Sequence, residues 1–281
     1  MMTELIPGRK LVLVFAVLAA GGLASCGQDA KQIVEQAVKT ELAADEADHT
    51  HWMYFEIDQT PKLTVKQWVV ETDKGDLKRV LEENGHQVSP NEQHTRIEGF
   101  IRNSSAQAKQ HKDNQNDDQQ ARQMLNMLPQ AFVWTVKSRQ SARTILHFVP
   151  DPHFDAPSYQ ARVFAAMEGD MTVDDLQHRV VSIKGRLTHI VKFGGGLLGN
   201  LQAGGSFEVE RHEISKGEWQ IVETHVHISG RALLFKSISE QEDDLKSKFK
   251  QLPSGLSPDD AEKMVLQQSG DLPQSAQLTR R

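Results

Sequence analysis

Three histidines have the type and spacing that could bind a metal ion or transfer protons. His225 and His227 stand two residues apart, a spacing that places both imidazoles on one face of a strand. His212 lies in the preceding alternating segment, which also carries two glutamates at the same period. A solvated sheet face explains the same pattern, because the residues that alternate with the histidines are apolar: Val222, Val226 and Ile228. The three histidines are therefore only weak metal candidates.

A glycine-rich segment over residues 193–205 has the composition of a phosphate-binding loop but not its other parts. No Gly-Lys-Ser/Thr follows it, and both flanks alternate like strands rather than opening a helix. We interpret it as a hairpin connection, or as an apolar lip formed by Leu197, Leu198 and Leu201. No nucleophile motif occurs either. The sequence therefore predicts a protein that is not an enzyme, with no cofactor and no catalytic residue.

The N-terminus carries the most specific chemical signal. Arg9 and Lys10 precede about ten apolar residues, too few to span a bilayer core of about 30 Å. The run ends at 23-LASC-26, which resembles a bacterial lipobox. This resemblance implies cleavage between Ser25 and Cys26 and acylation of the Cys26 thiol. An ordinary signal peptide with an incidental cysteine is the alternative.

Composition narrows the class of partner. The chain carries a net charge of −6, and removal of residues 1–25 leaves −7, so no nucleic-acid partner is expected. Cys26 is the only cysteine, which leaves no disulfide and no cysteine metal site once it is acylated. No other segment has the roughly 20 apolar residues of a membrane helix. We expect a folded domain that is stabilised by its apolar core and held to a membrane by lipid.

The periodicity predicts helices inserted between two sets of strands. A helix is expected from a cap at Asp29, and a second from the Ser89 cap with Pro90 behind it. Residues 106–120 are too polar to pack, so they suggest a solvated helix extension or a loop, followed by a helix over 118–128 that stops at Pro129. The predicted division is a signal peptide (1–25), a lipidated N-terminus with the first helix (26–48), a half-barrel (49–239, with a helical insert about 90–128) and a polar, partly disordered tail (240–281).

This order of elements, and phrases within residues 167–174, 180–186, 193–201, 204–210 and 230–236, resemble the outer-membrane lipoprotein-sorting family, the Lol carrier and receptor fold. The resemblance implies an α+β fold: one curved antiparallel sheet, an unclosed β-barrel of about 9–11 strands, with helices covering one face. It also implies a concave apolar face that accepts acyl chains. The residues expected to line this cavity or its lip are Trp68, Phe132, Trp134, Phe148, Phe193, Leu197, Leu198, Leu201 and Phe207.

Three functions are compatible with these observations. The first is an envelope lipoprotein whose half-barrel binds a lipid or an acylated protein without catalysis. The second is a structural lipoprotein of the same fold with a filled core, and the third, less favoured, is a metal-dependent hydrolase. In every case we expect the domain to be anchored to a membrane by lipid and to face the periplasm. The residue that follows Cys26 is Gly27. An aspartate at this position would favour the inner membrane, so glycine favours the outer membrane.

Overall fold

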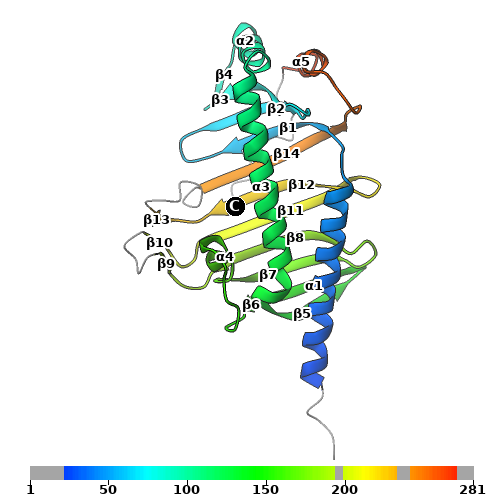
Figure 1. The fold of residues 1–281 in the computed structure, drawn as a ribbon, viewed down its shortest axis with the longest axis vertical. Coiled ribbons are helices and arrows are strands. Elements are labelled where there is room, and N and C mark those ends of the chain that lie inside the picture. The colour runs from blue at the N-terminus through cyan, green and yellow to red at the C-terminus, as the bar shows by residue number, and fades with distance from the viewer. Residues whose placement is uncertain (1–21, 194–198, 233–240, 271–281) are drawn as a thin grey trace, which may run out of the picture.

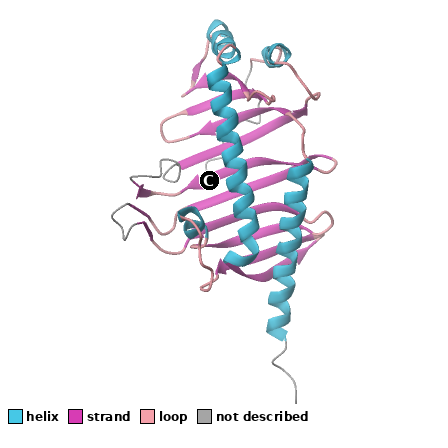
Figure 2. Ribbon diagram, viewed as in Figure 1, coloured by secondary structure: helices cyan, strands magenta, loops and turns pink. Residues whose placement is uncertain are grey.

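The computed structural model describes residues 22–193, 199–232 and 241–270. Its main body is an antiparallel sheet of 11 strands that does not close, in the order β4-β3-β2-β1-β14-β12-β11-β8-β7-β6-β5, and a small sheet of three strands, β13-β10-β9, lies beside it. Two long helices cross the large sheet in front of the strands (Figures 1 and 2). The predicted fold class, an α+β protein built on one unclosed antiparallel sheet, is confirmed.

The described helices are α1 (Gly22–Ala47), α2 (Pro90–Ile101), α3 (Ser104–Ala131), α4 (Tyr159–Phe164) and α5 (Pro258–Leu266). The first strands are β1 (Trp52–Gln59), β2 (Thr64–Val70), β3 (Leu77–Glu83), β4 (His86–Gln87), β5 (Phe132–Gln140), β6 (Arg143–Pro150) and β7 (Met167–Asp174). The remaining strands are β8 (Arg179–Leu187), β9 (Val191–Phe193), β10 (Gly199–Leu201), β11 (Ser206–Ser215), β12 (Glu218–His227), β13 (Gly230–Ala232) and β14 (Gln241–Gln251).

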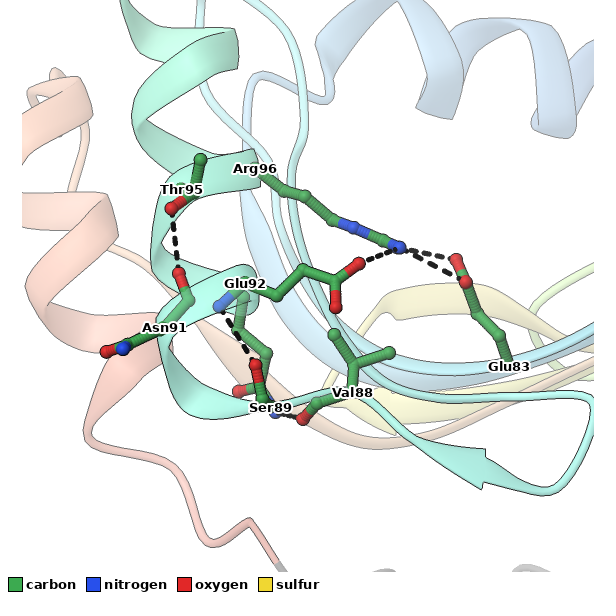
Figure 3. A network of polar contacts seen from close by, with 8 residues as sticks. Glu83, Val88, Ser89, Asn91, Glu92, Thr95 and Arg96 are labelled. Atoms are coloured by element: carbon green, nitrogen blue, oxygen red, sulfur yellow. Dashed lines mark hydrogen bonds and ion pairs between the residues drawn. The ribbon is translucent and has the colours of Figure 1, made fainter.

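The start of α2 follows the predicted cap. The Ser89 hydroxyl accepts a hydrogen bond from the backbone N–H of Glu92 at 3.3 Å, and proline follows the cap. Glu92 also pairs with Arg96 one turn later, and Arg96 reaches Glu83 on β3 (Figure 3). These bonds satisfy the first turn of the helix and tie it to the sheet.

Two helix boundaries differ from the prediction. Asp29 does not cap α1, because the helix already begins at Gly22 and the Asp29 carboxylate pairs with Arg139 at 2.5 Å. The whole polar stretch is helical in α3, which continues to Ala131 with Pro129 in its last turn. Packing extends this helix past the proline, because Leu128 and Ala131 are both buried in the core.

The prediction of a polar tail over residues 240–281 is wrong for its first part, because Gln241–Gln251 form strand β14. β14 lies in the middle of the large sheet, where it pairs with β1 on one side and β12 on the other. Only Leu245 and Phe249 are apolar in this 11-residue strand, so its sequence lacks the alternation that marks a half-buried strand. Pairing with distant strands, rather than local pattern, places it in the sheet.

The two faces of the sheet carry different cores. The strand registers place Phe148 and Phe207 on the face that α1 crosses, which we call the inner face. The same registers place Phe55 and Trp68 on the outer face, where they pack with Ile97 of α2 and Val265 of α5. The apolar core is therefore divided between opposite faces at opposite ends of the sheet.

Candidate functional site

The inner face is filled at the end formed by β5 to β8. Phe132, Trp134 and Phe148 are 3%, 2% and 1% exposed, and the Phe148 ring lies 4.7 Å from Phe132 and 5.2 Å from Trp134 between centroids. The Trp134 indole N–H donates to the carbonyl of Leu128 at 3.1 Å. These rings pack against one another and the small side chains of α1 as an interior does.

The other predicted cavity residues are distributed differently. Phe207 lies over Gly185, where an added Cβ would come within 2.7 Å of its ring, and so reaches the aromatic cluster. Leu201 is fully buried in the same core. Trp68 lies on the outer face, in a different core cluster from these residues. The side chains of Phe193, Leu197 and Leu198 lie outside the described residues.

The sheet forks between β12 and β14. These strands pair only from Glu223 opposite Leu245 to His227 opposite Gln241, and beyond that point they diverge, β12 staying with β11 and β14 with β1. Each strand has an irregularity just past the fork: Val222 has no partner on β11, and Lys248 has a positive φ of 59°. A bulge bends and twists a strand, and two facing bulges open the gap.

A cavity of about 370 Å³ occupies this fork. Half of its lining side chains are apolar, and both bulged residues belong to the lining, which consists of Ile57, His212, Ile214, Val222, Glu223, Leu245, Lys246, Ser247, Lys248 and Phe249. Ligand pockets in proteins are typically about 300–1,000 Å³ and mostly apolar with a few polar groups. The fork therefore has the size and character of a small amphiphile site.

Charges at the fork are mostly neutralised within the sheet. Lys246 pairs with Asp244 at 3.1 Å and lies 3.8 Å from Glu56. Burial lowers the pKa of Lys246, but the neighbouring Asp244 and Glu56 carboxylates outweigh it and hold that pKa above its ordinary value. Burial raises the pKa of Asp244. Among the described residues Lys248 forms no ion pair, and it is exposed at the rim.

The middle of α3 does not pack closely on the sheet that it crosses. In α3, every side chain from residue 111 to residue 123 is exposed, although the same helix is buried at Leu128 on the sheet. Its middle therefore does not pack on the strands below. The inner-face residues Val209, Thr224 and Val226 remain half-buried there, in contrast to the filled end of the sheet.

The three candidate histidines do not converge. His225 lies between Asp243 and Glu223, and His227 also reaches Asp243 at 2.9 Å. His212 instead pairs with Glu210 at 2.9 Å. Burial lowers the pKa of His225, but hydrogen bonds to Glu223 and Asp243 raise it above its ordinary value overall. Within the described residues, no group of three or more His, Cys, Asp or Glu side chains is arranged to hold a metal ion.

Cys26 lies in the first turns of α1, and its side chain is outside the described part of the structure. Within the residues that the structure describes, no helix combines the length and apolarity needed to span a bilayer.

The sequence analysis did not identify the half of the cavity lining that β14 contributes. Leu245, Lys246, Lys248 and Phe249 all belong to β14, which we expected to be a tail. The available signal was the pair Leu245 and Phe249 within a charged segment, which by itself favours neither strand nor helix.

Comparison with known proteins gives a distant likeness of structure. No known family matches the sequence, and no curated protein matches it significantly. Among solved structures, the chain is similar to a domain from Vibrio parahaemolyticus that is assigned to the outer membrane lipoprotein-sorting proteins. The two share 10% identity over 83% of this chain and 99% of that domain, with a TM-score of 0.29.

Proposed function

We propose that this chain is a lipid-anchored protein of the bacterial envelope that binds an acyl chain in the fork of its sheet. The observation that carries the proposal is the cavity of about 370 Å³ between β12 and β14, with five apolar side chains in its lining. Each buried CH₂ of a ligand would contribute about 0.8 kcal/mol. The ligand would be a lipid or the acyl group of a protein, and the role is binding rather than catalysis.

The anchor belongs to the same proposal. The sequence of residues 9–26, with its short apolar run and 23-LASC-26 ending, supports cleavage before Cys26 and acylation of its thiol. Two or three acyl chains hold a protein stably at a membrane. Gly27 supports the outer membrane, with the domain facing the periplasm.

A substitution that fills the fork tests the proposed binding. Val222→Trp adds an indole at the bulge that lines the cavity, so we expect it to abolish uptake of a fluorescent fatty acid while the protein stays folded. Leu176→Trp is the matched control, because Leu176 lies in a turn at 80% exposure. Binding is measured by fluorescence titration, and lipids carried through mild purification are identified by mass spectrometry.

The outcome separates two functions. Equal uptake by Val222→Trp and the wild type would place the ligand elsewhere and contradict the proposed site. No uptake and no co-purified lipid in the wild type would favour a structural lipoprotein. The observation that supports this second function is the filled aromatic cluster of Phe132, Trp134 and Phe148.

A further inference from the structure

Cys26 and the docked part of the first helix belong to one continuous helix. α1 extends without a break from Gly22 to Ala47, and among its described side chains Ala30, Val34 and Ala37 are fully buried. At 1.5 Å per residue, Cys26 lies only about 6 Å along the axis from Ala30. No linker therefore separates the proposed lipidation site from the folded domain.

Apolar burial and a buried ion-pair cluster fix this helix to the sheet, and an exposed ion pair lies near its start. Near its start, the Asp29 carboxylate pairs with Arg139 of β5 at 2.5 Å. Near its end, the buried Glu41 carboxylate pairs with Arg179 at 3.0 Å and Arg211 at 2.5 Å, and it accepts the backbone N–H of Val180 at 2.7 Å. A helix held in this way transmits the position of its N-terminus to the whole sheet.

The start of α1 projects past β5, the last strand of the sheet (Figure 1). Strand β5 thus presents the free edge nearest to Cys26. An unpaired edge of nine residues is prone to pair with other chains unless something covers it. It carries Val133 at 46% exposure, and the adjoining hairpin carries Arg143, an exposed cation without an ion pair among the described residues.

We propose that the domain stands on its β5 edge at the membrane surface, with Val133 and Arg143 at the lipid headgroups. This proposal rests on the acylation of Cys26 proposed above. It places β4 at the far end of the molecule, ten strand spacings or about 48 Å away along the sheet. The fork lies about 25–30 Å from the bilayer, so an acyl chain that occupies it has left the membrane.

Lipid-borne quenchers test this orientation. Because acylation consumes the only native cysteine, Val133→Cys and His86→Cys each provide one free thiol for a fluorophore on the full-length, lipidated protein. In phosphatidylcholine vesicles that contain nitroxide-labelled lipid, we expect the Val133 probe on β5 to lose most of its fluorescence. The His86 probe on β4 should keep its fluorescence.

A flexible Gly-Ser segment inserted between Gly27 and Gln28 is the matched control, because it preserves the lipobox but separates the anchor from α1. We expect this insertion to abolish the difference between the two probes. Equal quenching in the uninserted protein, with its acyl mass verified, would overturn the orientation and leave the anchor standing. A mature protein without acyl mass would refute the anchor and the orientation together.

Discussion

Glu71 is a half-buried carboxyl group whose titration contributes to the pH dependence of folding. Burial raises its pKa from 4.5 to about 7, although its carboxylate accepts the backbone N–H of Trp52 at 2.8 Å. Burial also raises the pKa of Asp76, which lies close enough to act on Glu71, and of Asp58 at the other end of β1. These groups bind protons more tightly in the folded state than in the unfolded chain, so folding is favoured at lower pH.

Glu71→Gln therefore has a predictable effect on stability. In the wild type the contribution of Glu71 is fully present below pH 4.5 and is lost as the pH rises to about 7. The glutamine keeps the acceptor for Trp52 and has no proton to lose. Relative to wild type, we expect the variant to gain about 1–3 kcal/mol in its free energy of unfolding between pH 4.5 and 7.5.

Urea unfolding at a series of pH values measures this difference. Exposed Asp73→Asn, which neutralises a neighbouring carboxylate at the surface, is the control and should leave the pH profile nearly unchanged. Parallel pH profiles for wild type and Glu71→Gln would show that the buried carboxyl group does not titrate as described.

At the scale of elements, α1 is held to the sheet by a charge cluster as well as by apolar packing. Glu41 is 5% exposed and compensates Arg179 and Arg211. Burial raises the pKa of Glu41, but the two guanidinium groups outweigh it and hold that pKa below its ordinary value. The cluster fixes the C-terminal part of α1 together with Leu42, which packs against the edge of the apolar core.

Removal of this carboxylate should be costly. Glu41→Ala leaves two arginines without their anion, and we expect a loss of about 3–5 kcal/mol in the free energy of unfolding. Asp45→Ala is the control, since its pair with Arg122 is exposed and should contribute less than about 1 kcal/mol. The free energy of unfolding of both variants is measured by thermal or urea unfolding. Equal losses in the two variants would contradict the proposed stabilisation of α1 by the Glu41 cluster.

The local sequence predicted helices and strands better than it predicted which of them lie side by side in the fold. The Ser89 cap is a local signal and occurs as predicted. The helical state of the polar stretch in α3 was left open, because its side chains contact mainly solvent and give no apolar stripe to interpret. β14 was missed because its stability comes from two distant partners.

At the scale of the whole molecule, the C-terminal strand holds two halves of the sheet together. β14 joins the β1–β4 half to the half formed by β5–β8, β11 and β12. A chain that ends at residue 240 would lose this joint and leave two new free edges. We expect it to lack a single cooperative unfolding transition and to aggregate.

A chain that ends at Gly270 is the matched control, because it retains every described helix and strand. It should unfold like the full chain in circular dichroism and calorimetry. Cooperative unfolding of the chain ending at 240, with unchanged enthalpy, would show that β14 is dispensable.

The sequence by itself determined the Ser89 cap, the strand alternation and the predicted site of acylation at Cys26, because each of these depends on residues close together in the chain. Only the tertiary structure decided which strands are neighbours, and therefore that Phe132, Trp134 and Phe148 fill one end of the inner face. It also decided that a cavity opens where Val222 and Lys248 leave their registers. Alternation assigns a residue to a face, whereas curvature, bulges and pairing arise from contacts between distant segments.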